Sequence, residues 1–91
     1  MNNPSNQNTE PVWFNSASII DTLDAREMLS SGQHPLAEVI NKTSALQPGQ
    51  IFELITPFRP MPLIEKVTDK GFLSFSQATT ESEFHTYFCK V

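Results

Sequence analysis

Apolar and polar residues alternate with two different periods along the chain, and these periods predict its elements. The stretch Ile19 to Leu23 is short and rich in β-branched residues, which is typical of a strand. After a break at Ser30-Ser31-Gly32, Pro35 fits the first position of a helix, where its missing N–H costs nothing. The apolar positions that follow have the i, i+3, i+4, i+7 spacing of one buried stripe: Leu36, Val39, Ile40 and Thr43. This pattern predicts an amphipathic helix over 35–45.

The second half of the chain repeats the order of strand and helix. Residues 51–56, "IFELIT", are apolar at both odd and even positions except at Glu53, as expected for a strand in the middle of a sheet. Pro62 then opens a second, short helix, and Gly71 stands where its C-cap belongs. The apolar stripe of this helix consists of Leu63, Ile64 and Val67.

Two further strand-like runs follow, from Phe72 to Gln77 and from Phe84 to Val91. The residues "ATTES" between them suit an antiparallel hairpin with a loop of about five residues or slightly more. The predicted order is therefore β-α-β-α-β-β. Because strand-helix-strand crossovers are right-handed, both helices are expected on one face of a four-stranded mixed sheet. The expected fold is a two-layer α/β (α+β) sandwich.

The N-terminal residues divide into a polar tail and an apolar segment. Residues 1–11 are mostly Asn, Gln, Ser and Pro, and we expect most of this tail to be disordered, with one domain over 12–91. Trp13 and Phe14 are large apolar groups that we expect to dock onto the domain. The predicted strands also carry apolar groups on both faces, so the face without helices needs a cover. Either the "PVWF" segment covers it, or a protein partner or a second copy does.

Composition narrows the function classes. The net charge is -4 with only six Lys and Arg, which argues against binding to nucleic acid, and 38% hydrophobic residues are too few for a membrane span. The first residues lack the regions of a signal peptide, so we expect a cytoplasmic protein. One cysteine, Cys89, excludes an internal disulfide and a zinc site built on several thiolates. The two histidines, His34 and His85, show no ligand-like spacing, and we expect no metal or cofactor.

An ordered set of short motifs carries a family resemblance. These are "LDAR" at 23–26, "GQHPL", "LQPGQ" at 46–50, "PFRPMPL" at 57–63 and "KG" at 70–71. Together they resemble a bacterial family described as domain of unknown function 2249, which is in turn similar to small sulfur carriers of the TusA and SirA type. The likeness covers roughly Val12 to Val91.

The resemblance implies a sulfur-carrier-like fold but not the carrier chemistry. In those carriers a Cys-Pro-x-Pro motif opens the first helix, and its cysteine holds the transferred sulfur. Aligning the second proline of that motif with Pro35 places Gly32 at the cysteine position, so no thiol is available there. The loop before the helix is also two residues longer than in the carriers.

Three residues are candidates for a small anion site. Helix N-termini that follow parallel strands emerge at one sheet edge, where open α/β sheets commonly bind ligands. Arg26, His34 and Arg59 are expected at that edge. The alternatives are structural: Arg26 pairs with Asp24 or a nearby carboxylate, His34 only opens its helix, and Arg59 only aids solubility.

The leading hypothesis is a small non-enzymatic interaction or ligand-binding domain with a sulfur-carrier-like fold that lacks the carrier cysteine. The alternative is a divergent sulfur-transfer or redox accessory protein acting through Cys89. A lone cysteine in an apolar-rich strand, however, is more typical of an inert packed residue. RNA binding rests only on a similar topology in a bacterial translation initiation factor domain.

Overall fold

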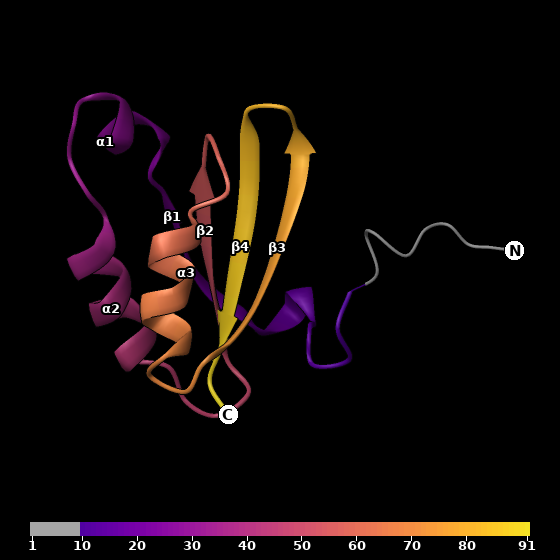
Figure 1. The fold of residues 1–91 in the computed structure, drawn as a ribbon. Coiled ribbons are helices and arrows are strands. Elements are labelled where there is room, and N and C mark those ends of the chain that lie inside the picture. Colours follow the sequence, from indigo (N-terminus) through magenta and orange to yellow (C-terminus); the bar gives the residue numbers. More distant parts are fainter. Residues whose placement is uncertain (1–9) are drawn as a thin grey trace, which may run out of the picture.

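The computed structural model describes residues 10–91, so most of the predicted disordered tail lies outside the described residues. The elements are a 3₁₀ turn η2 (Ser16–Ser18), β1 (Ile19–Asp24), α1 (Arg26–Ser30), α2 (Leu36–Ser44), β2 (Ile51–Thr56), α3 (Met61–Thr68), β3 (Leu73–Thr80) and β4 (Glu83–Cys89). The predicted α+β sandwich is confirmed. Figure 1 shows the sheet as one layer, with α2 and α3 packed on one of its faces.

The four strands form one mixed sheet in the order β1-β2-β4-β3. β1 and β2 are parallel, whereas β4 pairs antiparallel with both β2 and β3. β2 therefore lies inside the sheet, as its apolar residues at both odd and even positions predict.

The core lies between the sheet and the helices. Phe52 and Leu54 of β2 and Phe88 of β4 point to this side and are fully buried. Val39 of α2 and Val67 of α3 meet them from the helix layer. The two helical stripes predicted from the sequence thus face the same core, which fixes the helices against the sheet by apolar burial.

The structure adds one helix that the sequence pattern does not predict. α1 is only five residues long, and a helix of that length is not stable alone because nucleation is costly. It is held at its start, where Asp24 accepts a hydrogen bond from the Arg26 backbone N–H at 3.1 Å. Ala25 is fully buried beside it, and its N–H donates to the Ile55 carbonyl at 2.9 Å. Tertiary contacts rather than periodicity therefore form α1.

The hairpin between β3 and β4 is tighter than predicted. β3 continues to Thr80 and β4 begins at Glu83, so the connection has two residues instead of about five. The Thr79 hydroxyl donates to the Glu83 carbonyl, and the Thr80 hydroxyl accepts from the Ser82 N–H. These bonds extend the β conformation into residues that the sequence pattern assigns to the loop.

The sheet face without helices, called here the helix-free face, is partly covered by the N-terminal segment. Phe75 of β3 and Tyr87 of β4 lie side by side on this face. The Phe14 ring packs on both, with centroid distances of 4.6 Å to Tyr87 and 5.6 Å to Phe75. The docking of Phe14 is confirmed, and Trp13 follows it with an edge contact at 6.4 Å. A protein partner on the rest of this face stays a prediction.

Candidate functional site

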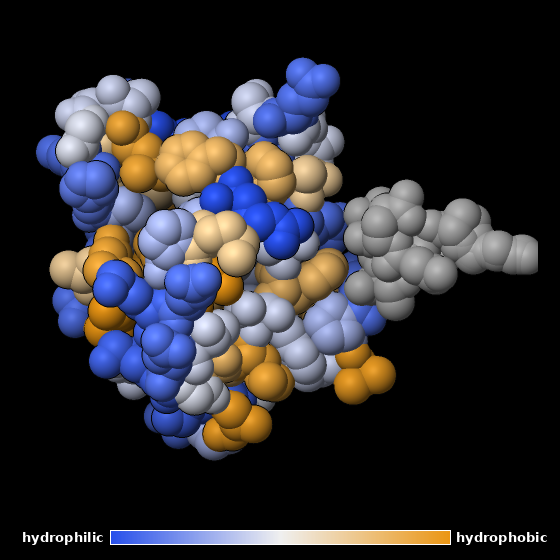
Figure 2. All heavy atoms as spheres, in the orientation of Figure 1, coloured by the Kyte–Doolittle hydropathy of each residue, from blue (hydrophilic) through white to orange (hydrophobic). Residues whose placement is uncertain are grey.

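A hollow of about 260 Å³ opens where β2 ends and the helices α2 and α3 begin. Its walls are mainly apolar and come from four segments, represented by Leu29 of α1, Leu36 of α2, Phe58 of the loop after β2 and Leu63 of α3. In Figure 2, apolar side chains come to the surface in the upper part of the molecule, over this junction. We call this feature the α2/α3 hollow.

Prolines shape the α2/α3 hollow. Pro35 precedes α2 and Pro60 precedes α3, and both are buried, while Pro62 lies in the first turn of α3. The rings fix the backbone at both helix starts, so these walls are stiff. The Thr56 hydroxyl donates to the Phe58 carbonyl and so holds the loop between β2 and α3. The sequence motifs "HPL" and "PFRPMPL" are thus the two sides of one hollow.

Two basic side chains lie at this hollow, His34 before α2 and Lys66 on α3. Among the described residues that line it, none is a carboxylate. Arg59 is exposed in the loop leading to α3. An apolar hollow with basic groups and no acidic ones favours a small, mainly apolar occupant with a negative end.

Arg26, the third residue of the predicted anion site, is bound to carboxylates. Its guanidinium donates to Asp24 at 2.9 and 2.7 Å and to Glu83 at 3.0 Å. This is the structural alternative foreseen for Arg26, extended to a second carboxylate. The pairing lowers the pKa of Asp24 below its ordinary value, because the guanidinium hydrogen bonds favour the ionised carboxyl. The shared site of Arg26, His34 and Arg59 stays a prediction, now with Lys66 as an additional basic group at the hollow.

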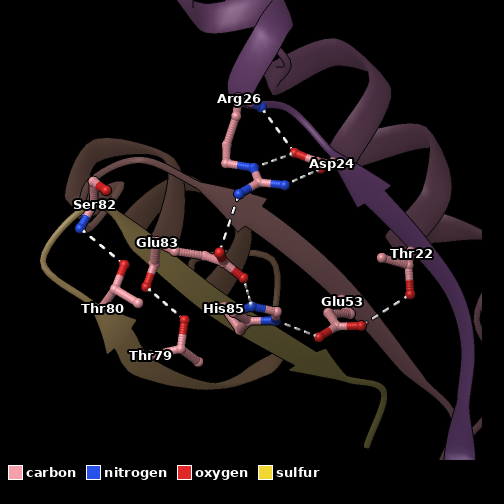
Figure 3. Close-up of polar contacts among 9 residues, drawn as sticks. All are labelled: Thr22, Asp24, Arg26, Glu53, Thr79, Thr80, Ser82, Glu83 and His85. Atoms are coloured by element: carbon pink, nitrogen blue, oxygen red, sulfur yellow. Dashed lines mark hydrogen bonds and ion pairs between the residues drawn. The ribbon is translucent and has the colours of Figure 1, made fainter.

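A chain of polar groups, shown in Figure 3, runs along the helix-free face. His85 lies at its centre, with Nδ1 2.6 Å from a Glu53 oxygen and Nε2 2.7 Å from a Glu83 oxygen. The Thr22 hydroxyl donates to the other Glu53 oxygen at 3.0 Å. Arg26 and Asp24 continue the chain beyond Glu83. We call these six residues the His85 network; they join β1, β2, β4 and the start of α1.

The geometry of the His85 network favours a protonated imidazole. Both ring nitrogens face a carboxylate, and only the imidazolium donates from both. Burial lowers the pKa of His85, but the hydrogen bonds to Glu53 and Glu83 raise it more, so its pKa lies above the ordinary value. The hydrogen bond with His85 in turn lowers the pKa of Glu83. Burial together with the nearby Glu53 carboxylate raises the pKa of Tyr87 to about 12.

The contacts of the His85 network are those of a structural network, because the Arg26 guanidinium and both ring nitrogens of His85 are paired with carboxylates within it. A general base needs a free lone pair, and neither ring nitrogen of His85 offers one. Within residues 10–91 no group of three or more His, Cys, Asp or Glu side chains is placed to hold a metal ion.

Sequence reasoning did not find the His85 network, although two signals were present. Glu53 is the only charged residue in an otherwise apolar strand, and Glu83 and His85 are two apart, so they share a face of β4. The strand order that places β2 beside β4 is what joins these signals.

Cys89, the last residue of β4, lies opposite Ile51 of β2 and Leu73 of β3 rather than at a reactive position. It is 3% exposed, and burial raises the pKa of its thiol above the ordinary value. A thiol of this kind is rarely ionised at neutral pH. The predicted packing of Cys89 is confirmed.

Fold and site together define a small α+β domain with a four-stranded mixed sheet, a helix layer on one face and an apolar hollow at the helix starts. Residues 22–88 match the family model described as "Uncharacterized conserved protein (DUF2249)", and the chain belongs to this family. No curated protein and no solved structure matches the chain significantly. In the described part of the chain, no helix has the length and apolar character needed to cross a membrane.

Proposed function

We propose that this domain is a non-enzymatic binding module, with a sulfur-carrier-like fold that lacks the carrier cysteine, and that its ligand enters the α2/α3 hollow. The observation that carries the proposal is the apolar hollow at the end of β2, with His34 and Lys66 beside it. Ligands of open α/β sheets bind at this kind of position.

The size of the hollow limits the ligand. About 260 Å³ is below the roughly 300–1,000 Å³ of typical small-molecule sites. A short apolar chain or one aromatic ring with a carboxylate is the occupant that fits both the walls and the charges.

The position of the carrier cysteine supports a role in binding rather than in sulfur transfer. Gly32 lies in the loop before α2 with a φ of 86°, a left-handed conformation that favours glycine over residues with a side chain. A cysteine there would be strained, so this loop is built without the thiol.

An NMR titration with hexanoate tests the proposal, with 1-hexanol as the uncharged probe of equal chain length. We expect hexanoate to shift the amides around His34 and from Phe58 to Lys66, and to bind more tightly than 1-hexanol. Lys66→Gln should remove most of that preference, whereas Lys70→Gln, beyond the far end of α3, should retain it. Absence of shifts at both helix starts with millimolar hexanoate and 1-hexanol would contradict the proposal.

The alternative is covalent chemistry at Cys89. A thiol-specific reagent at neutral pH under native conditions distinguishes it from the proposed binding function. The burial of Cys89 predicts slow modification that becomes rapid in denaturant. Rapid modification of the folded protein would favour the sulfur-transfer or redox alternative instead.

A further inference from the structure

The outer edge of β3 is an uncharged and unpaired strand edge. β3 is the last strand of the sheet and, with eight residues, the longest of the four. Its sequence, "LSFSQATT", contains no charged residue and no proline. Strand edges of soluble proteins usually carry charges, prolines or a cover that prevents pairing with another strand. Along most of its length β3 lacks these protections.

The opposite edge of the sheet is protected. β1 carries Asp21 and Asp24, and its pairing with β2 is irregular between Ile19 and Asp21. Asp21 forms an ion pair with Lys42 of α2 at 2.9 Å. The two edges of one sheet therefore differ in charge and regularity, which makes β3 the edge available for pairing.

No part of the described chain covers the β3 edge with backbone hydrogen bonds. Within residues 10–91, the backbone bonds of β3 run to β4, and none of those formed by loops and turns involves residues 73–80. Figure 1 shows β3 as the outermost strand. The N-terminal segment reaches β3 through the Phe14 ring, which packs on the face of Phe75 rather than along the edge.

We propose that β3 pairs antiparallel with β3 of a second copy of this chain, so that two four-stranded sheets become one. Each chain has a net charge of -4, so two copies associate most readily where neither presents a charge. An identical strand related by a two-fold axis satisfies this condition and pairs each edge with itself.

The regular part of β3 limits the register. The pairing of β3 with β4 is regular from Leu73 to Ala78 and shifts only between Ala78 and Thr80. We place the two-fold axis at Phe75, inside this segment, so that Phe75 lies opposite Phe75 of the other copy and Leu73 opposite Gln77. Residues that face each other across antiparallel strands share one sheet face, so both pairs lie on the helix-free face. Leu73 is 37% exposed in the single chain, and this pairing covers it.

The dimer is expected to depend on concentration. A contact confined to one pair of strands is small beside the roughly 1,200–2,000 Å² that stable interfaces bury. Analytical ultracentrifugation of the full chain should show a reversible monomer-dimer equilibrium with a dissociation constant below about 1 mM. A chain that stays monomeric up to that concentration would overturn the proposal.

Charges at the paired positions test the register. Gln77→Lys and Leu73→Glu should each weaken dimerisation by about tenfold or more, because each places a charge against an uncharged strand. The uncharged Gln77→Met should leave it intact. The double variant Leu73→Glu with Gln77→Lys should restore the dimer, since each lysine then faces a glutamate of the other copy.

Two further results would contradict this interface. Failure of the double variant to restore dimerisation, with both chains folded by amide NMR spectra, would exclude the proposed register. Ile20→Lys lies on the opposite edge of the sheet. If it weakened the dimer as much as Gln77→Lys does, the contact would not be at β3. Hexanoate binding at the α2/α3 hollow is measured independently, so either proposal can fail alone.

Discussion

The two faces of the sheet are held by different kinds of interaction. The helix-covered face is closed by fully buried apolar side chains, among them Phe52, Leu54 and Phe88. The helix-free face instead carries an aromatic cluster of Phe14, Phe75 and Tyr87 beside the His85 network. Apolar burial does not depend on pH, whereas a network centred on an imidazolium does. The contribution of the helix-covered face to stability is therefore independent of pH, whereas that of the helix-free face changes with pH.

The largest expected effect comes from the helix-covered face. Phe88→Ala removes a fully buried core ring from β4, the strand that lies between β2 and β3, and we expect a loss of about 3–5 kcal/mol in the free energy of unfolding. Urea denaturation followed by circular dichroism measures it. A loss below about 1 kcal/mol would mean that this core is loosely packed.

A smaller loss is expected from the cover of the helix-free face. Phe14→Ala removes a half-buried ring from Phe75 and Tyr87, and we expect about 2 kcal/mol. Trp13→Ala is the control, because among the ring contacts of residues 10–91 Trp13 meets Phe14, whereas Phe14 meets both Phe75 and Tyr87. If Trp13→Ala costs more than Phe14→Ala, the segment docks in another way.

The His85 network should give this face its pH dependence. Because the folded pKa of His85 is raised above 6.5, its stabilisation is complete below that pH and is lost as the pH rises through the folded pKa. Cys89 acts in the same direction only above pH 9, its ordinary pKa. Stability of the natural protein should therefore fall between pH 6.5 and 9.

His85→Gln isolates this effect. We expect it to cost about 1 kcal/mol at pH 6, because two carboxylates lose a charged donor, and to flatten the pH profile between 6.5 and 9. His34→Gln is the matched control and should keep the slope of the natural protein. A slope that persists in His85→Gln would show that the pH dependence has another source.

The sequence predicts the elements formed by periodic patterns and misses those formed by contacts between distant segments. The strand 51–56 and the helix over 35–45 follow from apolar spacing, and the structure has them within one residue at each end. α1 depends on Ala25 pairing with Ile55, which no local pattern reveals. Glu53 and His85 are 32 residues apart and meet only because β2 lies beside β4. Of the candidate site, His34 was found from its place before a helix proline, whereas Lys66 became apparent only with the hollow.

The smallest effect is expected from a charge pair at the rim of the helix-covered face. Lys42 and Asp21 form an ion pair at 2.9 Å, but both side chains are about 40% exposed. Exposed pairs contribute little because water screens them. Lys42→Gln should leave the urea midpoint unchanged within error, while NMR should show the pKa of Asp21 rising from its lowered value, since its main hydrogen-bond donor is gone. A clear loss of stability at neutral pH would mean that charge also supports the helix-covered face, and the contrast between the two faces would fail.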